Sequence, residues 1–283
     1  MNITKAVITA AGKDQRRLPL QNLVDRTGQS KSALTIILDE VFAAGIEETA
    51  VIVCPGDIPS FSAAAGEHAS KIRFIEQNDP KGYGDALLRA RSFTGTDSFL
   101  HLISDHLYLS FDPGRSCVAQ LLETARGESV SVSAVQATRE TKLPHYGAVG
   151  GVRVANKPGQ YLIHQVLEKP TPTEAEQQLI VPGLRSGYYL CYFGIHVLTP
   201  GVMDLLDGQS AESGGTLSLS PALAELARRE KYLALELRGR RYNIGLKYGL
   251  LTAQLALALA GNDREEVLSQ MVELLAEKER HIQ

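Results

Sequence analysis

The first hundred residues alternate between short apolar runs and segments with helical spacing, and this alternation constrains the fold more than any other feature of the chain. Four runs have the length and apolar content of buried strands: residues 5–10 (KAVITA), 49–54 (TAVIVC), 72–76 (IRFIE) and 98–104 (SFLHLIS). Helices are expected between them, one capped by Ser30 and followed by Gly45, and another over 85–92. Because such connections cross over the sheet, the chain is expected to form an α/β fold with a mainly parallel sheet and helices on both faces.

The middle of the chain has a different pattern, with several strand-like segments and few helical ones. These segments cover residues 129–135, 146–154, 161–167 and 188–197, and Pro, Gly and Asn residues separate them. Helical spacing returns at 221–229 and 248–260. Since neither a linker-like composition nor a fixed repeat interrupts the chain, we expect one domain over residues 1–262, with a β-rich insertion at about 129–200.

The C-terminal segment, residues 263–283, is predicted to form a separate amphipathic helix. Val267, Met271, Leu274 and Leu275 fall on one face of this helix, and Glu, Lys and Arg residues lie opposite. Such an apolar face is expected to pack on the body of the protein or on a neighbouring subunit. The segment therefore makes a homo-oligomer one of the possible partners of the chain.

The amino-acid composition limits which other classes of partner the chain is expected to bind. The 283 residues include 29 basic and 32 acidic side chains, a net charge of −3, which argues against a broad surface for nucleic acid or membranes. No apolar run approaches the roughly 18 residues that span a bilayer. Cys54, Cys117 and Cys191 are sparse, scattered and odd in number, as is typical of a reducing compartment. We therefore expect a cytoplasmic protein with no nucleic-acid or membrane partner.

Polar or glycine-containing segments follow several of the predicted strands, at the edge where open parallel sheets bind ligands. The first of these segments is residues 11–19 (AGKDQRRLP). Gly12 followed by basic residues can bring backbone N–H and guanidinium groups onto phosphate oxygens. Because the segment holds a single glycine, an ordinary charged surface loop is the alternative interpretation.

The second segment, residues 77–86 (QNDPKGYGDA), lies between a predicted strand and a predicted helix. Gly82 and Gly84 allow another group to approach the backbone closely. Gln77 offers one donor and one acceptor to the edge of a planar base. A plain two-glycine turn explains the same residues.

The third feature is Asp105, which follows the strand-like run 98–104. A carboxylate at the end of a strand suits Mg²⁺, which takes a few protein oxygens together with phosphates of a substrate. A helix N-cap or a turn aspartate is the alternative interpretation. His106 is interpreted as a histidine with an internal partner, since the histidines of the chain show no metal-binding spacing.

Two further segments repeat the combination of a strand end with an oxygen ligand and a cation. Glu168 and Lys169 close a strand-like run and could hold a sugar hydroxyl and a phosphate, although an exposed ion pair is the simpler alternative. Residues 242–247 (YNIGLK) bring together an asparagine, a glycine and a lysine. The common position of all these segments is more informative than any one of them.

Taken in order, the segments resemble the sugar-1-phosphate nucleotidyltransferases, and in particular the bacterial UTP–glucose-1-phosphate uridylyltransferases. The resemblance extends from Lys5 to about Ala260. The matching segments are KAVITAAG (5–12), Arg16 with Leu18 and Pro19, LVD (23–25), Gln77 with KGYGDA (81–86), Asp105, HYGAVG (145–150), EKP (168–170), SLSPA (218–222), and Asn243, Gly245, Lys247 and Gly249 in the place of D-x-G-x-K-x-G.

This resemblance implies a Rossmann-like fold of the nucleotide-diphospho-sugar transferase type, in which residues 1–262 are the nucleotidyltransferase domain and 129–200 the sugar-binding part. It also implies an activity: UTP and glucose 1-phosphate, or related substrates, react by Mg²⁺-assisted in-line attack to give UDP-glucose or a related NDP-sugar and pyrophosphate. The resemblance implies that the nucleotide is bound by Ala11, Gly12, Gln77, Gly82 and Asp105, and that the sugar is bound by Tyr146, Gly147, Glu168, Lys169 and Tyr188. It implies that Mg²⁺ is bound by Asp105 and Asn243. The catalytic residues that it implies are Arg16, which contacts the triphosphate, Asp105 and Lys169.

The sequence departs from the family pattern in the loop after the first strand. Asp14 and Gln15 stand where the family has a second glycine and a threonine, and an aspartate there would repel a triphosphate unless it turned outward. The lysine-containing P-K-E-M-L-P block of the family has no counterpart. Lys13 or Lys31 would have to supply that cation.

Two more departures lie in other matched segments. Asp85 replaces the histidine of the family's KGLGHA stretch, and Asn243 replaces an aspartate at the metal site. An amide oxygen can still coordinate Mg²⁺. The departures together support a second hypothesis, a catalytically lapsed homologue that binds a nucleotide or nucleotide-sugar as a regulatory or sensor protein.

Overall fold

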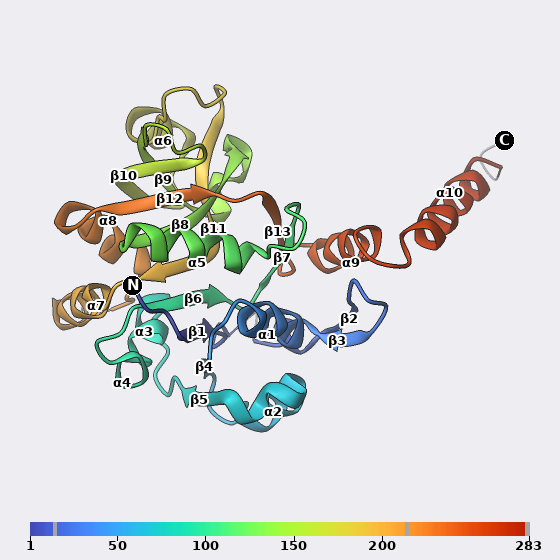
Figure 1. Ribbon diagram of the computed structural model, residues 1–283, viewed down its shortest axis with the longest axis horizontal. Helices are drawn as coiled ribbons and strands as arrows, with labels where there is room; N and C mark the ends of the chain where they lie inside the picture. The colour runs from blue at the N-terminus through green and yellow to red at the C-terminus, as the bar shows by residue number, and fades with distance from the viewer. Residues whose placement is uncertain (14–15, 213–214, 281–283) are drawn as a thin grey trace.

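The computed structural model describes residues 1–13, 16–212 and 215–280 (Figure 1). Its strands are β1 Lys5–Thr9, β2 Asn22–Val24, β3 Ser30–Ser32, β4 Glu48–Val53, β5 Ile72–Glu76, β6 Phe99–Ile103, β7 His106–Ser110, β8 Ser131–Arg139, β9 Gly147–Arg153, β10 Gln160–Glu168, β11 Tyr188–Leu198, β12 Tyr232–Glu236 and β13 Gly239–Asn243. Its α-helices are α1 Ala33–Ala43, α2 Ile58–Ala65, α3 Tyr83–Leu88, α4 Arg91–Thr94, α5 Cys117–Glu128, α6 Pro172–Gln178, α7 Gly201–Glu212, α8 Leu219–Arg229, α9 Gly249–Leu259 and α10 Arg264–Arg280. Short 3-10 turns cover Leu18–Leu20, Gly66–Lys71 and Glu140–His145.

A nine-stranded sheet in the order β5-β4-β1-β6-β11-β8-β12-β10-β9 organises the molecule. The first four of these strands run parallel, as does the pair β8–β12. The β-rich middle of the chain joins the same sheet through antiparallel pairs, and an additional β11–β9 pairing closes β11, β8, β12, β10 and β9 into a ring. The expected α/β class is confirmed, with its parallel core in β5, β4, β1 and β6.

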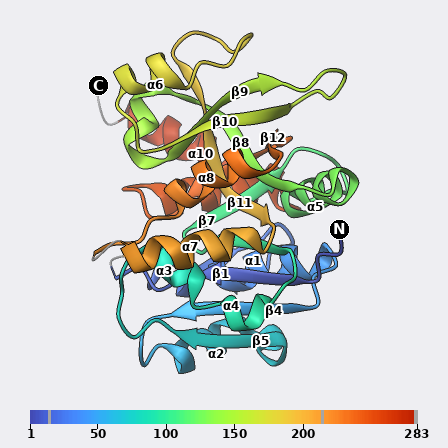
Figure 2. The ribbon, with the colours of Figure 1, turned by 90° about the vertical axis from the view of Figure 1, so that its left-hand side faces the viewer.

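Helices cover both faces of the parallel strands (Figure 2). The alternation along β1 shows how the sequence produces this arrangement: Ile8 packs with residues of α1, α2 and α5, whereas Val7 packs on the other face with residues of α3, α7 and α8. Both side chains are completely buried. A strand that is covered on both faces reads as a continuous apolar run, which is why these strands were recognisable in the sequence.

The first predicted helix begins later than expected. Ser30 does not cap it, because Ser30–Ser32 pairs with Asn22–Val24 as a small antiparallel ribbon. The N-cap is Ser32, whose Oγ accepts a hydrogen bond from the backbone N–H of Thr35 at 2.9 Å. Gly45 follows the helix with a positive φ of 89°, as predicted for a residue beyond a helix C-terminus.

Two other expectations for the first hundred residues need correction. The helix expected over 85–92 is divided into α3 and α4, with Arg89 and Ala90 between them. Helix α2 was not predicted, because its sequence IPSFSAAA combines a proline with small and polar residues and shows only a short apolar face. Helix α2 connects β4 to β5, and α3 with α4 connects β5 to β6, so all three lie in connections between parallel strands.

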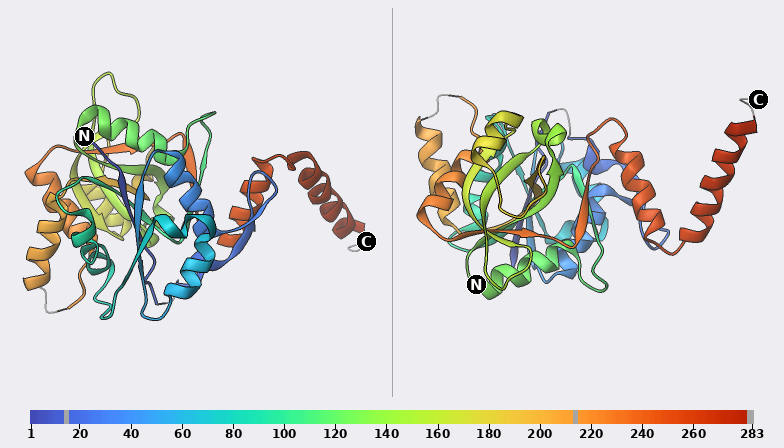
Figure 3. Two further views of the ribbon diagram at one scale, coloured as in Figure 1. Left: turned by 60° about the horizontal axis from the view of Figure 1, so that its bottom comes forward. Right: turned by 90° about the horizontal axis from the view of Figure 1, so that it is seen from above.

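The C-terminal helix α10 extends away from the rest of the molecule (Figures 1 and 3). The side chains of Val272, Leu274 and Leu275 are 64%, 67% and 65% exposed. Of the two expected packing partners, the body of the protein does not cover these three side chains, whereas the first turn of the helix, around Val267, lies beside α9 and the residues that follow β2. Packing on a neighbouring subunit stays a prediction. Within the described ranges, no helix combines the length and apolar character needed to cross a membrane.

Candidate active site

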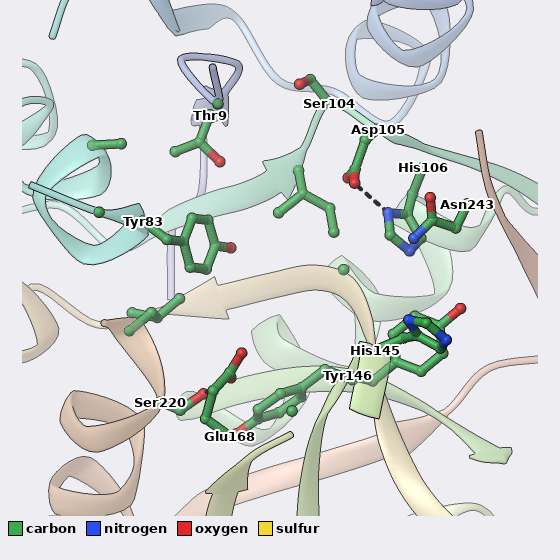
Figure 4. A pocket seen from close by; sticks show the side chains of 18 of the residues that line it. Thr9, Tyr83, Ser104, Asp105, His106, His145, Tyr146, Glu168, Ser220 and Asn243 are labelled. Carbon is green, nitrogen blue, oxygen red and sulfur yellow. Dashed lines mark hydrogen bonds and ion pairs between the residues drawn. The ribbon is translucent and has the colours of Figure 1, made fainter. Parts of the chain in front are cut away.

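A cavity of about 660 Å³ lies between the ends of the parallel strands β5, β4, β1 and β6 and the ring of strands β11, β8, β12, β10 and β9 (Figure 4). It is therefore at the position where open α/β sheets bind ligands. Its lining comes from several segments far apart in the sequence: Thr9–Lys13, Gln77, Pro80, Gly82, Tyr83, Ala86, Ile103–His106, Pro144–Gly147, Glu168, Lys169, Tyr192, Gly194, His196, Leu219, Ser220, Leu223, Asn243 and Leu246. Most of the residues expected to form a site are brought together here.

The segment after β1 lines the cavity from Thr9 to Lys13. The backbone N–H of Ala10 donates to the carbonyl of Ile52 on β4, and Thr9 accepts through its carbonyl from the N–H of Ser104. Ala11 and Gly12 are thus held at the end of the parallel strands, as predicted. Asp14 and Gln15, on which part of the departure from the family pattern depends, lie outside the described residues.

Gln77 follows β5 and also lines the cavity, although it is only 3% exposed. Its backbone N–H donates to the carbonyl of Val53 on β4, at 2.9 Å. Its side-chain nitrogen donates to the carboxylate of Asp85 at 2.6 Å and to the carbonyl of Gly82 at 3.1 Å. The side chain is therefore fixed in place by its own protein partners.

Gly82 is required by a close backbone approach. Its φ is 106°, and a Cβ there would come within 2.6 Å of the carbonyl oxygen of Leu217. Two hydrogen bonds join the same segments. The N–H of Leu217 donates to the carbonyl of Lys81, and the N–H of Gly84 donates to the carbonyl of Leu217. Gly82 and Gly84 leave room for the segment before α8, and the hydrogen bonds hold this segment against one wall of the cavity.

Asp105 and Asn243 meet at one end of the cavity (Figure 4). Asp105 lies between β6 and β7, and Asn243, the last residue of β13, is paired with His106, the first residue of β7. The N–H of Ile244 donates to the carbonyl of Asp105 at 2.9 Å, which joins the two strand ends. Because the carboxylate of Asp105 can only accept, Nδ1 of His106 donates to its Oδ1 at 2.8 Å, as expected for a histidine with an internal partner.

The donor atoms of this pair fit a hard divalent cation. Oδ2 of Asp105 has no hydrogen-bond partner within the described part of the chain. Oδ1 of Asn243 accepts from the N–H of Gly245 at 2.8 Å and keeps a second lone pair. Carboxylate and amide oxygens are preferred ligands of Mg²⁺, which commonly completes its shell with phosphates and water.

Glu168 lies across the cavity from Asp105, and the ring of Tyr146 packs edge-on against that of His106, with 6.2 Å between the centroids (Figure 4). Glu168 closes β10 next to Gly147 on β9, and its Oε2 accepts a hydrogen bond from Oγ of Ser220 at 2.6 Å. The guanidinium of Arg241 lies over the ring of Tyr146, 3.8 Å from its centroid. That contact, which the sequence did not suggest, fixes the ring as a wall of the cavity.

Lys169 has an unusual backbone conformation for a lysine. Its φ is 46°, in the left-handed region, and its N–H donates to the carbonyl of Tyr146 at 3.2 Å. Its ammonium lies 3.9 Å from the carboxylate of Glu168, and the two side chains are 58% and 45% exposed. Strained conformations of this kind concentrate at functional sites. The loose pair leaves both charges available to a ligand.

Two predicted site residues do not line the cavity. Arg16 lies 3.6 Å from the carboxylate of Asp57 at the start of α2. The hydroxyl of Tyr188 accepts from Nε of Arg139 at 2.9 Å, which lowers the pKa of this tyrosine. Of the two candidate replacement cations, Lys13 lines the cavity, whereas Lys31 is engaged with Asp25 and Asp39.

A buried polar network beneath the cavity was missed in the sequence. The hydroxyl of Tyr83 lies 2.6 Å from Nε2 of His101, whose Nδ1 lies 3.0 Å from the carbonyl of Val7. Since the carbonyl can only accept, Nδ1 carries the proton and Nε2 accepts from the tyrosine. Burial lowers the pKa of His101 to about 4, so the ring is neutral at physiological pH. The one signal was a lone polar residue inside an apolar strand.

A second group of hydrogen bonds lies beside the first, where the ring of His196 stacks on that of His101 with 5.8 Å between the centroids. Nδ1 of His196 lies 2.6 Å from Oγ of Ser133, which also contacts the hydroxyl of Tyr232. The hydroxyl of Tyr192 lies 3.3 Å from that of Tyr232. His196, Tyr192 and Tyr83 line the cavity, so the network supports its floor. Burial also lowers the pKa of His196.

Comparison with known proteins decides the family. The family model described as nucleotidyl transferase matches residues 5–257. The chain belongs to this family. The resemblance found in the sequence is confirmed, and the protein is a member of an enzyme family.

Named relatives extend over nearly all of this nucleotidyltransferase. A UTP–glucose-1-phosphate uridylyltransferase 2 from Streptococcus pyogenes serotype M3 is 25% identical, with 91% of this chain and 91% of its own length covered. A UTP–glucose-1-phosphate uridylyltransferase from Streptococcus pyogenes is 26% identical, with 91% of this chain and 89% of its own length covered.

Solved structures share the fold. The UDP-glucose pyrophosphorylase from Acinetobacter baumannii has a TM-score of 0.75 at 22% identity, with 96% of this chain and 100% of that chain covered. A UDP-glucose pyrophosphorylase in complex with UDP-glucose has a TM-score of 0.73 at 22% identity, with 90% and 98% covered. The predicted fold type of the nucleotidyltransferase is therefore confirmed.

Proposed function

We propose that this nucleotidyltransferase joins UTP and glucose 1-phosphate, or a closely related sugar 1-phosphate, to form UDP-glucose or a related NDP-sugar and pyrophosphate. The observation that carries the proposal is the position of Asp105 with Asn243 and of Glu168 with Lys169 on two sides of one cavity. The first pair suits a metal ion and phosphates, and the second suits a sugar phosphate. The names of the relatives, which are UTP–glucose-1-phosphate uridylyltransferases, support the same substrates.

The nucleotide would occupy the side of the cavity formed by the parallel strands. Gln77 and Gly82 would contact the base, and the backbone of Ala11 and Gly12 would face the triphosphate. Arg16 would have to leave Asp57 before its guanidinium could reach the triphosphate. An exposed pair of this kind is weak, so this movement requires little free energy.

The sugar phosphate would occupy the other side. Glu168 would accept hydrogen bonds from sugar hydroxyls, and the ammonium of Lys169 would bind the phosphate. Tyr146 and Gly147 would form the wall behind the sugar. We leave Tyr188 out of the proposed site, since its hydroxyl is bound to Arg139 and it does not line the cavity.

The proposed reaction is a substitution at phosphorus. An oxygen of the sugar phosphate forms a bond to the α-phosphorus of UTP, and the bond from that phosphorus to the bridging oxygen of pyrophosphate breaks. Asp105 and Asn243 would hold Mg²⁺, which would supply positive charge to offset that of the phosphates. The residues of the chain need only orient the two substrates and offset their negative charge, because no covalent enzyme intermediate and little proton transfer are required. We also propose that the enzyme works in the cytoplasm.

Product analysis tests the proposal. The purified protein is incubated with UTP, glucose 1-phosphate and Mg²⁺, and UDP-glucose and pyrophosphate are quantified. We expect both products in equal amounts, and no product when any one of the three components is left out. A protein that binds UTP but forms no nucleotide-sugar from any of a panel of sugar 1-phosphates would contradict the proposal and support the lapsed, nucleotide-binding homologue.

A further inference from the structure

An ion pair between the buried Asp85 of helix α3 and the exposed Arg89, which follows that helix, lies directly behind Gln77. The side chain of Asp85 is 4% exposed, and its Oδ1 accepts from Arg89, one helical turn later, at 2.8 Å. Asp85 occupies the position at which the resembled family has a histidine. The pair is therefore a property of this chain that the family pattern does not account for.

The ion pair determines which way the Gln77 amide points. Nε2 of Gln77 donates to Oδ2 of Asp85 at 2.6 Å and to the carbonyl of Gly82 at 3.1 Å, which uses both of its protons. An ionised carboxylate and a carbonyl can only accept. Rotating the amide by 180° would place its oxygen against both of these acceptors, so the flipped orientation is strongly disfavoured.

The other end of the amide faces the cavity. Gln77 lines the cavity, and no donor within the described residues reaches its Oε1. This oxygen is also not among the fully buried polar atoms that lack a partner. Gln77 therefore presents an acceptor, and no donor, to whatever binds beside it.

We propose that Asp85 is a positioning residue that makes the base subsite selective for a pyrimidine with an N–H at ring position 3; this rests on the proposed function in placing the base beside Gln77. Uracil carries such an N–H, whereas cytosine has an acceptor at the same position. An acceptor facing an acceptor leaves both without a hydrogen bond, which a desolvated subsite discriminates against. Asp85 produces this selectivity by orienting Gln77, without contacting the nucleotide itself.

Replacing Asp85 with asparagine should relax the constraint. The carbonyl oxygen of the new side-chain amide is expected to stay on the guanidinium of Arg89, which leaves the amide nitrogen facing Gln77. Gln77 can then turn its oxygen toward this nitrogen and present its own Nε2 to the base, and only the carbonyl of Gly82 still opposes this orientation. Arg89→Gln is the matched control, because it removes the same ion pair but leaves the carboxylate of Asp85 as an acceptor.

Equilibrium binding of UTP and of CTP to the full-length protein, the Asp85→Asn variant and the Arg89→Gln variant tests the inference. We expect the unmodified protein and Arg89→Gln to favour UTP by at least about tenfold, and Asp85→Asn to lower this preference by about tenfold. The preference is a ratio measured on one preparation, so a lower folded fraction in a variant does not affect it. Turnover is measured separately. If the protein shows the expected binding preferences but no turnover, the proposed function is contradicted and the role of Asp85 is not.

An unchanged preference for UTP in folded Asp85→Asn, or an equal loss in Arg89→Gln, would overturn the role of Asp85. A second measurement needs no variant: UTP methylated at N3 lacks the donor, and we expect the unmodified protein to bind it at least about tenfold more weakly than UTP. Equal binding of the two nucleotides would overturn the inference even if Asp85→Asn could not be purified in folded form.

Discussion

The two sides of the cavity differ in how firmly they hold their polar groups. On the nucleotide side, Gln77, Asp85 and His106 are each 3% exposed, and each has a hydrogen-bond partner within the protein. On the sugar side, the side chains of Glu168 and Lys169 are 45% and 58% exposed, and their charged groups are 3.9 Å apart. One side is fixed before any ligand arrives. On the other side, Ser220 holds one oxygen of Glu168, whereas the second oxygen of Glu168 and the ammonium of Lys169 can still adjust.

This difference indicates where selectivity is determined. Buried groups that are held by partners cannot adapt to a wrong ligand, so they discriminate strongly. Exposed lysine and glutamate side chains have many rotamers and can accommodate related ligands. We therefore expect the nucleotidyltransferase to be more selective for the base than for the sugar.

The largest effect is expected from Asp105, the proposed metal ligand on the fixed side. In Asp105→Asn, turnover should fall by about 10³-fold, because the variant loses the charge that holds the cation against the phosphates. The melting temperature should change little, since an asparagine oxygen can still accept from His106. Steady-state kinetics and thermal unfolding measure the two effects. Asp207→Asn, an exposed carboxylate on α7, is the control, and near-normal turnover in Asp105→Asn would remove the metal site from this position.

A smaller effect is expected from Lys169, on the adjustable side. Lys169→Met should raise the KM for the sugar 1-phosphate by about 10- to 100-fold, the effect of losing one hydrogen bond to a charged group. The KM for UTP should stay nearly constant. Lys71→Met, which removes a lysine that lies over the ring of Phe42 and does not line the cavity, should leave both constants unchanged. A rise in the KM for UTP instead would place Lys169 on the nucleotide side.

Acid sensitivity is expected from the network beneath the fixed side. Burial lowers the pKa of His101 from 6.5 to about 4, so below pH 6.5 the unfolded chain binds a proton that the folded chain rejects. Stability should therefore decrease as the pH falls, by about 2 kcal/mol per such histidine between pH 7 and pH 5. Urea unfolding at several pH values measures this dependence.

The His101→Gln variant isolates the contribution of this histidine. Its free energy of unfolding should depend less steeply on pH, even if the variant is less stable at every pH. His164→Gln replaces an exposed histidine of β10 and should keep the steep dependence. Parallel curves for the unmodified protein and His101→Gln would mean that His101 titrates normally in the folded chain.

The smallest effect is expected from Tyr188. Because its hydroxyl is bound to Arg139 outside the cavity, Tyr188→Phe should change kcat/KM for the sugar 1-phosphate by less than about twofold. Tyr146→Ala, made alongside it, should show a clear loss and establish that the assay responds to the sugar side. A tenfold loss in Tyr188→Phe would return this residue to the sugar subsite, as the family resemblance implied.

The parallel part of the fold was predictable because its strands are apolar runs bounded by turn residues. The ribbon of Asn22–Val24 with Ser30–Ser32 was not, since three-residue strands carry no periodicity. The ring of antiparallel strands was expected only as a β-rich insertion, because pairs such as β11–β9 join residues about forty positions apart and local pattern does not specify them.

The candidate site was predictable where it depends on strand ends. Asp105, Gln77 and Glu168 each follow or close a strand, and the topology of the sheet brings them to one cavity. What the sequence could not indicate is the state of each side chain: Arg16 is engaged by Asp57, and Gln77 is oriented by Asp85. Those contacts depend on rotamers and on turns between neighbouring segments.

The most direct test of this account measures kcat/KM for four substrate pairs: UTP or CTP, each with glucose 1-phosphate or galactose 1-phosphate, in the presence of Mg²⁺. The account predicts pyrophosphate release with UTP, a loss of at least about tenfold when CTP replaces it, and a smaller loss when the sugar is exchanged. A sugar preference larger than the base preference would contradict the assignment of a fixed nucleotide side and an adjustable sugar side.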